Sequence, residues 1–399
     1  MARRIHALRT ENYRSLASLE LRLGDVNVLF GPCGVGKSTL LDTIWFLRDC
    51  ASNSVDQAAR RRDHGIGLLW DGASPDDAIV IEVESASARY RVEFGLSAGR
   101  IEARASERLS SVAEDETKFE RAGGADHVLI WQESAADPGR EPHEYRLREP
   151  NKLSLARYLD ANPQDTAAVE LESALRFVHH YASRRLHLYP LQKTGSESGQ
   201  ETRLDDFARN LWSVLRNLKD RRERDDRYDT ILRFMREAFP KTFDRLEFEQ
   251  LGHSGVYASM VEHGRQDPIK ASGISDGHLQ MLVVLTALFS ERRDQGSLVL
   301  FDEPELSLHP WPLAVMGDAM RTAASEWNKQ IIVATHSPVL ISQFEPDDLL
   351  AVEIDADEGK TTVRRASEIA EIADLLEQFA PGAIYMAQEI APQGGRTPK

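Results

Sequence analysis

Cysteine is almost absent from this chain. Only Cys33 and Cys50 occur among its 399 residues, which excludes a disulfide framework and a cysteine zinc cluster. Long apolar runs are missing too, since the longest, Met281 to Phe289, is too short to cross a bilayer. The opening MARRIHALRT has no apolar signal core. We therefore expect a cytoplasmic protein with no membrane association.

Basic residues are too few to balance the acidic ones. The 49 lysines and arginines face 64 aspartates and glutamates, and the formal net charge is −15. This balance argues against nonspecific DNA binding by the whole surface. A local basic groove stays open as an alternative, with candidates at 60–62, 184–185 and 221–227. Solvated helix faces explain each cluster more simply.

Hydropathy patterns predict a chain that mixes strands and helices. Alternation predicts a β-hairpin in 1–24 and a strand meander in 78–103. Polar residues 104–150 predict loop with one strand near 127–131. Helical patterns cover 165–182 and, as two helices, 204–239. Other predicted elements are a Gly/Ser-rich loop at 192–202, strands near 246–248, 256–261 and 349–354, and a helix at 372–379.

The most informative motif is GPCGVGKST at 31–39, which fits the pattern G-x-x-x-x-G-K-[ST]. An apolar strand pattern at 25–30 precedes it and a helix pattern at 39–47 follows. Glycines let consecutive N–H groups turn toward phosphate oxygens, and the helix N-terminus adds positive potential. Lys37 can hold the outer phosphates, and Ser38 can ligate Mg²⁺. The predicted nucleotide-contacting residues are Gly31, Pro32, Cys33, Gly34, Val35, Gly36, Lys37, Ser38 and Thr39.

A second motif supplies carboxylates. The apolar residues 297–301 predict a buried strand that ends in Asp302 and Glu303. If this strand ends beside the phosphate loop, Asp302 can hold Mg²⁺ and Glu303 can polarise an attacking water. Alone, the pattern would be an acidic turn after a strand. After a phosphate loop, the metal-binding interpretation is favoured.

Two further segments are candidates for phosphate contacts. The apolar strand pattern 329–335 delivers His336, whose imidazole can hydrogen-bond a γ-phosphate or the attacking water. Ser275 precedes a strongly apolar helix pattern at 279–289, and with Asp276 and Gly277 it can form an anion site at a helix N-terminus. A plain N-cap is the alternative explanation for Ser275.

Taken together, these motifs resemble the ATP-binding-cassette ATPase superfamily, in its non-transporter branch of RecF-like, SMC-like and OLD-family-type AAA proteins. The residues that carry the resemblance lie in 1–100 and 245–355. They are Ile5 with ENYRS at 11–15, the Walker A loop GPCGVGKST, ISDGH at 274–278 in the place of the signature, LVLFDEPE at 298–305 as Walker B, ELSLHP at 305–310 as D-loop, and ATHSP at 334–338 with the switch histidine.

The resemblance implies an α/β P-loop NTPase with a mixed sheet, an N-terminal antiparallel β subdomain and an inserted helical lid or arm. It divides the chain into 1–103 and 243–355 as the two parts of the ATPase domain, 104–242 as the mainly helical insertion, and 356–399 as a helix and tail. It also implies that two chains sandwich two ATP molecules, with Ser275 acting on the partner's nucleotide.

The chain departs from this family pattern in several places. Cys33 stands where the RecF-like loop usually has Asn, and Asp276 and His278 replace Gly and Gln of the signature. A carboxylate near a γ-phosphate is unfavourable unless it faces away, so hydrolysis is expected to be slow. Gln57 is the nearest candidate for a Q-loop glutamine. The chain has no C-x-x-C zinc hook, and its tail is too short for a TOPRIM nuclease domain.

The sequence therefore predicts a Mg²⁺-dependent ATPase with Glu303 as base and His336 as γ-phosphate sensor. We expect a homodimer or higher oligomer and, by family analogy, a separate effector or nuclease partner in anti-phage defence or genome maintenance. One alternative is an ATP-binding sensor or scaffold with negligible turnover. Another is a RecF-like DNA-binding repair protein. A transporter cassette is disfavoured by the insertion and the ELSLHP turn.

Overall fold

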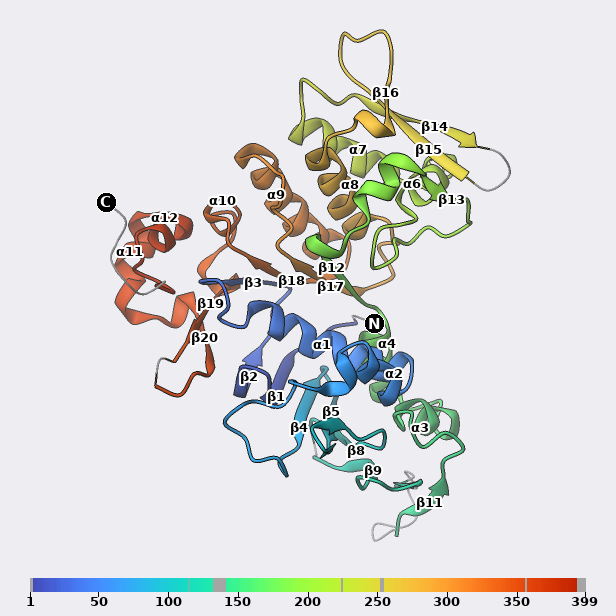
Figure 1. The fold of residues 1–399 in the computed structure, drawn as a ribbon, viewed down its shortest axis with the longest axis vertical. Coiled ribbons are helices and arrows are strands. Elements are labelled where there is room, and N and C mark those ends of the chain that lie inside the picture. The colour runs from blue at the N-terminus through green and yellow to red at the C-terminus, as the bar shows by residue number, and fades with distance from the viewer. Residues whose placement is uncertain are drawn as a thin grey trace.

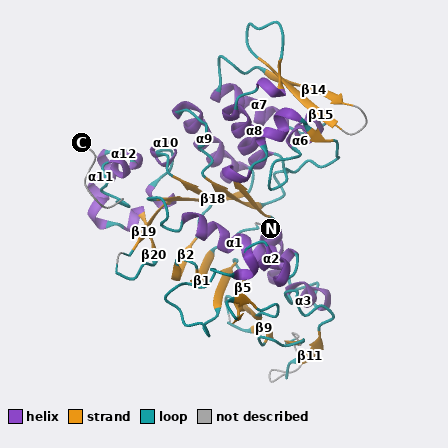
Figure 2. Cartoon of the chain, viewed as in Figure 1, coloured by secondary structure: helices purple, strands orange, loops and turns teal. Residues whose placement is uncertain are grey.

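The computed structural model describes residues 3–113, 115–131, 141–223, 225–251, 255–355 and 357–392. A six-stranded sheet crosses the middle of the molecule (Figure 1). A β-rich part lies below it and a mainly helical part above it, as the secondary-structure colours in Figure 2 show. This is the predicted α/β fold with an antiparallel N-terminal subdomain.

The N-terminal sheet is antiparallel, with strand order β11-β10-β9-β8-β5-β4-β1-β2. The predicted hairpin and meander are confirmed as β1–β2 and β4–β5. The strand bounds are β1 Ala7–Tyr13, β2 Leu16–Arg22, β4 Ile79–Glu84, β5 Ala88–Phe94, β8 Ser106–Ser111, β9 Thr117–Arg121, β10 His127–Ile130 and β11 His143–Arg146, with a separate pair β6 Leu96–Ser97 and β7 Arg100–Ile101.

The strand predicted near 127–131 is confirmed as β10, but the expectation that the rest of 104–150 is loop was wrong. Three more strands form there, and all four extend the N-terminal sheet. Polar residues at buried positions hide the alternation, because Glu107 and Arg121 face inward and pair with each other at 3.0 Å. The first part of the segment 104–242 is therefore continuous with the β subdomain. Residues 132–140 of this segment, which were also predicted as loop, lie outside the described residues.

The central sheet has strand order β12-β17-β18-β3-β19-β20. The first five strands run parallel, and β20 pairs antiparallel with β19. Parallel sheets need cover on both faces, which explains the nearly continuous apolar runs in these strands. Their bounds are β3 Val26–Phe30, β12 Val178–Ala182, β17 Ser297–Asp302, β18 Lys329–Thr335, β19 Leu349–Ile354 and β20 Thr361–Arg365.

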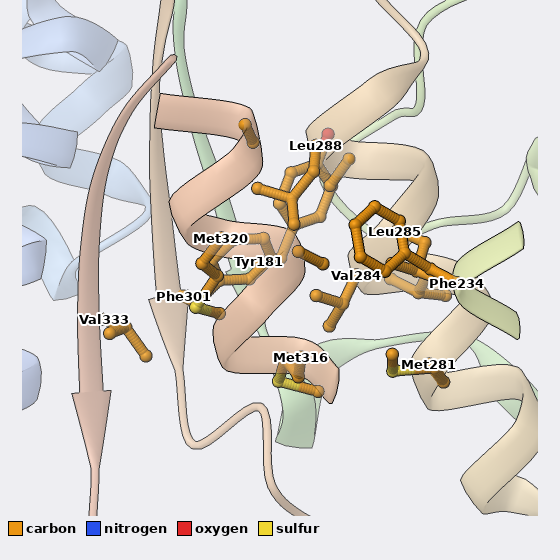
Figure 3. Packing of buried hydrophobic residues seen from close by; sticks show 14 of the residues in the cluster. Tyr181, Phe234, Met281, Val284, Leu285, Leu288, Phe301, Met316, Met320 and Val333 are labelled. Carbon is orange, nitrogen blue, oxygen red and sulfur yellow. The ribbon is translucent and has the colours of Figure 1, made fainter. Parts of the chain in front are cut away.

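Two hydrophobic cores lie on the two faces of this sheet, and successive strand residues alternate between them. Val28, Phe301 and Val333 join the core beneath the upper helices. Leu29, Leu300 and Ile332 join the core shared with the first helix and the N-terminal sheet. Figure 3 shows the upper core, where Met281, Val284, Leu285, Leu288, Met316 and Met320 pack with Tyr181, Phe301 and Val333.

The helices cover both faces of the sheet. Helix α1 (Lys37–Ser52) contacts β12, β17 and β18 from one side, and α9 (Pro310–Glu326) contacts β3 and β18 from the other. The predicted pair of helices in 204–239 is confirmed as α6 and α7. The other bounds are α2 Val55–Arg60, α3 Leu155–Ala161, α4 Thr166–Arg176, α5 Leu188–Lys193, α6 Leu211–Asp220, α7 Arg227–Ala238, α8 Asp276–Phe289, α10 Pro338–Ile341, α11 Ala373–Gln378 and α12 Pro381–Met386.

One helix prediction was partly wrong. The pattern 165–182 predicted a helix throughout, but α4 ends at Arg176 and residues Val178–Ala182 form strand β12. The β-propensity of this five-residue run and its pairing with β17 outweigh the helical periodicity. The small sheet of the upper part has the order β13-β15-β14, with β16 paired to β15. Its bounds are β13 Ser196–Glu197, β14 Arg245–Leu251, β15 Gly255–Val261 and β16 Ile269–Lys270.

The carboxyl ends of the parallel strands meet at one edge. Ala182 on β12 pairs with Asp302 on β17, and Asp302 pairs with Ala334 on β18. Ala334 in turn pairs with Leu29 on β3. The residues that follow each strand therefore lie next to one another, and they include Gly31, Arg184, Glu303 and His336.

Candidate active site

The loop 31–36 has the backbone shape that a phosphate cradle requires. Gly31, Gly34 and Gly36 have φ angles of 149°, 82° and 102°. A Cβ at Gly31 would lie 2.1 Å from the carbonyl oxygen of Val352, so only glycine fits there. Helix α1 begins directly after the loop, and no side chain caps its N-terminus. Its first N–H groups can therefore bind an anion.

Lys37 is folded back over this loop. Its side chain is buried, and Nζ donates to the carbonyl oxygens of Gly31 at 2.9 Å and Pro32 at 2.7 Å. Burial lowers the pKa of Lys37 to about 8, although nearby carboxylates favour its charged form. An incoming phosphate would stabilise the ammonium and replace these carbonyl contacts.

Ser38 and Asp302 are joined across the site. The Ser38 hydroxyl donates to Oδ1 of Asp302 at 3.0 Å. Burial raises the pKa of Asp302, and the neighbouring charge of Glu303 raises it further. A hydroxyl and a carboxylate oxygen suit Mg²⁺, which completes its octahedron with phosphate oxygens and water. Within the described residues, no group of three or more His, Cys, Asp or Glu is placed to hold a metal ion.

Glu303 lies at the same edge in a constrained position. Its φ of 53° is in the left-handed region, which is costly for a residue with a side chain. Its N–H donates to the carbonyl oxygen of Ala334 at 2.9 Å. Its carboxylate accepts two hydrogen bonds from Arg184, at 3.1 and 3.3 Å. The imidazole Nε2 of His336 lies 3.9 Å from the same carboxylate.

His336 is held by its backbone. Its N–H donates to Oε1 of Glu305 at 2.7 Å, which ties the residue to the turn after β17. Its Nε2 lies 3.7 Å from the Sγ of Cys33 in the phosphate loop. Burial and the charge of Lys37 lower the pKa of His336, so the ring is neutral at neutral pH. A neutral imidazole can donate one hydrogen bond to a phosphate oxygen.

The predicted signature residues lie elsewhere. Ser275 caps α8 by accepting the N–H of His278, as the plain N-cap alternative requires. Ser275 and Asp276 are exposed. A Cβ at Gly277 would meet the backbone oxygen of Ser307 at 2.6 Å, so the helix start packs tightly on the D-loop. Among the residues described, no hydrogen bond or ion pair joins 275–277 to the loop 31–39.

Gln57 is not part of this assembly, because it is an exposed residue of helix α2. The segment beside Asp302 and Glu303 is instead Ser183–Arg185, the turn that follows β12. Sequence reasoning treated Arg184 and Arg185 only as a basic cluster. The sequence signal for this turn was the strand VHHYA that precedes it. The wrong prediction of a helix over 165–182 concealed that strand.

The structure also shows a clamp that sequence reasoning missed. Buried Gln280 of α8 donates through Nε2 to Oγ of Ser183 at 2.7 Å and to the carbonyl oxygen of Pro304 at 3.2 Å. It therefore connects the signature helix to both segments that surround Glu303. A buried glutamine in an otherwise apolar helix was the available signal.

The candidate basic grooves are largely neutralised by carboxylates. Arg62 is buried and binds Asp42 at 2.7 Å and Asp49 at 3.1 Å. Arg60 pairs with Asp56, and Arg227 pairs with Asp225. Arg224 lies outside the described residues. These ion pairs reduce the free positive charge that a continuous DNA-binding surface would need.

A cleft of about 1010 Å³ leads away from the metal edge along α1. It is lined by Ser38 and Asp302 at one end and by Arg48 and Arg61 further on. His180 lies in its wall, where burial lowers the pKa to about 3 and keeps the ring neutral. Nδ1 of His180 is 2.8 Å from Nη2 of Arg185 and accepts its hydrogen bond, so the ring proton sits on Nε2.

This combination defines a nucleotide-binding domain with the P-loop NTPase fold. A glycine loop, a strand-end Asp-Glu pair and a strand-end histidine meet at the carboxyl edge of one parallel sheet. The family model described as "AAA domain, putative AbiEii toxin, Type IV TA system" matches residues 26–342. The chain belongs to this family of nucleotide-binding AAA ATPases.

Comparisons with individual proteins agree with this fold. An SMC head bound to the C-winged helix domain of ScpA is 14% identical, with a TM-score of 0.51 and coverage of 90% of this chain and 96% of that one. An SMC head with an extended coiled coil, bound to the C-terminal domain of ScpA from Pyrococcus furiosus, is 13% identical, with a TM-score of 0.50 and coverage of 94% and 99%.

One curated relative matches a short part of the sequence. Protein ea59 of Escherichia phage lambda is 39% identical over 70 residues, which are 18% of this chain and 13% of the phage protein. Separately, none of the helices in the described ranges has the length and apolar character needed to cross a membrane.

Proposed function

We propose that this chain is a Mg²⁺-dependent ATPase whose ATP-bound form dimerises. The observation that carries the proposal is the 3.0 Å hydrogen bond between Ser38 and Asp302, because it brings the two halves of a metal–phosphate site together. The metal, when bound, would neutralise charge on the β- and γ-phosphates.

Each residue at the edge then has a chemical task. The N–H groups of 34–39 and Lys37 bind phosphate, while Ser38 and Asp302 hold the metal. Glu303 accepts the proton of the attacking water. His336 donates a hydrogen bond to the γ-phosphate, and its neutral state at neutral pH suits that task.

Dimerisation is proposed from the exposure of the signature. Ser275 and Asp276 are exposed at the start of α8, and in the described part of the chain no hydrogen bond or ion pair joins them to the phosphate loop. A second copy could place Ser275 against the γ-phosphate, so that the composite site closes only around a triphosphate. The helix N-terminus would supply additional N–H donors.

The wider role is proposed by analogy. The family's description names a toxin of a type IV toxin–antitoxin system, and a phage protein shares a short similar stretch. These support a task in anti-phage defence or genome maintenance, in which ATP-driven dimerisation controls a separate effector or nuclease. Direct control of a DNA transaction is the second candidate, and the paired arginines weigh against it.

Phosphate release tests the enzymatic part. The Glu303→Gln variant should bind ATP but lose phosphate release by at least about 100-fold, since the general base contributes that much. Glu149→Gln makes the same change at an exposed carboxylate that pairs with Lys152 in the β subdomain, and as the matched control it should keep the wild-type rate. If wild type and Glu303→Gln turn over equally slowly, the chain is a nucleotide sensor and not an ATPase.

Mass in solution tests dimerisation. Glu303→Gln with ATP and Mg²⁺ should shift from monomer to dimer mass in light scattering, because the uncleaved triphosphate keeps the closed state. Ser275→Arg should abolish the shift while leaving ATP binding intact. A monomer mass at saturating ATP would contradict the sandwich.

A further inference from the structure

Arg184 covers the carboxylate that the proposed reaction needs. Its Nε and Nη2 donate to the two carboxylate oxygens of Glu303, so the pair is bidentate. The Arg184 side chain is 78% exposed, whereas the Glu303 side chain is 21% exposed. No other carboxylate among the described residues pairs with Arg184. One end of this ion pair is therefore free to move into solvent.

A carboxylate in this state is a poor general base. The guanidinium stabilises the ionised carboxylate, and its two hydrogen bonds fill one lone-pair site on each oxygen. Glu303 becomes a stronger base toward water when Arg184 releases one or both oxygens. The geometry thus separates two states of the site, one with Glu303 covered and one with Glu303 available.

The backbone of Glu303 cannot perform this change. Its N–H is bound to Ala334, and its carbonyl oxygen accepts a hydrogen bond from Oγ of Ser183 at 2.7 Å. Ser183 is itself held by Gln280. Because the backbone is fixed from both sides, release of the carboxylate comes from side-chain motion, and Arg184 is the more exposed of the two partners.

We propose that Arg184 exchanges between Glu303 and the γ-phosphate of a bound nucleoside triphosphate. A guanidinium binds phosphate in the same forked geometry as a carboxylate, so a γ-phosphate beside Lys37 and His336 competes directly for it. A diphosphate lacks this anion and leaves the ion pair intact. Arg184 is then a positioning residue that frees Glu303 only when a triphosphate is present. This inference rests on the proposed nucleotide site.

Equilibrium binding to four proteins tests the exchange without requiring hydrolysis. The probes are ADP and the nonhydrolysable triphosphate analogue AMP-PNP, both with Mg²⁺, and the proteins are wild type, R184Q, E303Q and the double variant. In wild type, Arg184 must leave Glu303 before it binds phosphate, so R184Q should lower AMP-PNP affinity by less than about threefold. In the E303Q background Arg184 has no ion pair to break before it binds phosphate. There R184Q should lower AMP-PNP affinity about tenfold.

Two further variants serve as controls. R184K in the E303Q background should keep most of the AMP-PNP affinity, because the lysine retains a charge for the γ-phosphate. R222Q removes an exposed arginine that pairs with Asp229, and it should change neither the AMP-PNP affinity nor the ADP affinity. Within each Glu303 background, the Arg184 substitutions should leave ADP affinity unchanged, and thermal unfolding checks that each of the six proteins is folded.

The outcomes distinguish this inference from the proposed function. If R184Q changes AMP-PNP affinity by the same factor in both backgrounds, Arg184 does not exchange and the inference is overturned. A loss of ADP affinity equal to that for AMP-PNP would overturn it as well. If wild type binds neither nucleotide, the proposed function itself fails.

Discussion

At the scale of single residues, burial decides how the phosphate loop is charged. Lys37 is almost completely enclosed, and it is held by two carbonyl oxygens in place of a carboxylate. Its lowered pKa follows, because neutral carbonyl groups compensate the lost hydration of an ammonium only in part. A phosphate bound beside Lys37 would therefore stabilise the charged ammonium form of this side chain.

Nucleotide affinity should therefore depend on pH. The free protein has a Lys37 pKa of about 8, and bound phosphate raises it, so binding takes up a proton above that pH. We expect ATP affinity to be level below pH 7.5 and to fall by up to about tenfold per pH unit above pH 8. Isothermal titration calorimetry across this range measures it.

Because the Cys33 thiol lies in the same loop, the pH series is measured in a Cys33→Ser protein. Lys37→Ala in that protein is the control, which should bind ATP weakly and show no such fall of affinity with pH. An unchanged slope in Lys37→Ala would assign the pH dependence to another group.

At the scale of elements, ion pairs fix the helices around the site. Arg62 follows α2, and its guanidinium reaches Asp42 and Asp49 on α1. Burial opposes the charge of Asp42, but the adjacent Arg62 outweighs it and lowers the Asp42 pKa. This cluster orients the helix that begins in the phosphate loop.

Arg62→Gln should consequently destabilise the protein. It removes the least exposed cation of Asp42 and Asp49, while Arg14 still reaches Asp42 and Arg61 still reaches Asp49. We expect the free energy of unfolding to fall by about 2 kcal/mol, the size of a lost hydrogen bond to a charged group. Arg60→Gln is the matched control, because Arg60 is 63% exposed and pairs with Asp56 at the surface. That change should cost no more than about 0.5 kcal/mol.

Denaturant midpoints of the two variants measure the difference. Equal midpoints would show that Arg62 is not a structural ion pair, and would return it to the candidates for nucleic-acid contact.

At the scale of the whole molecule, the two ends of the central sheet have different chemistry. The carboxyl end forms the candidate site. At the opposite end, Glu291 after α8 contacts Lys329 and His179, at the starts of β18 and β12. All three are buried. Burial opposes the charge of Glu291, but the His179 imidazole 3.2 Å away and the charge of Lys329 outweigh it and hold its pKa well below the usual range.

Acid should weaken this second cluster. A carboxyl with a depressed folded-state pKa contributes stability above its ordinary value near 4.5, and that contribution is lost as pH falls toward the folded-state pKa. We expect the melting temperature of wild type to fall between about pH 5 and about pH 3, with a shallower slope in Glu291→Gln. Glu358→Gln, at an exposed pair with Lys360, should keep the wild-type slope.

Most of the site could be predicted from sequence because its parts are local. The glycine loop, the strand that ends in Asp302 and Glu303, and the strand that delivers His336 each combine a short motif with a flanking apolar run. Parallel strands align their carboxyl ends, so the meeting of these motifs follows from the fold class. The roles assigned to the individual residues stay predictions.

The elements that failed depended on distant partners. Residues Val178–Ala182 become a strand because β17 offers a parallel neighbour, and the strands after 104 form because the N-terminal sheet has an open edge. Neither partner is visible in a local window, so periodicity alone assigned helix and loop.

The sequence by itself determined that a P-loop precedes a strand-end Asp-Glu pair and a strand-end histidine, since those motifs specify their own turns and strands. Only the tertiary structure decided that Arg184, and not Gln57, lies beside Glu303, and that Arg62 is buried between helices. Such contacts join residues far apart in the chain. They depend on which strands become neighbours, and that choice is made by the packing of the whole sheet.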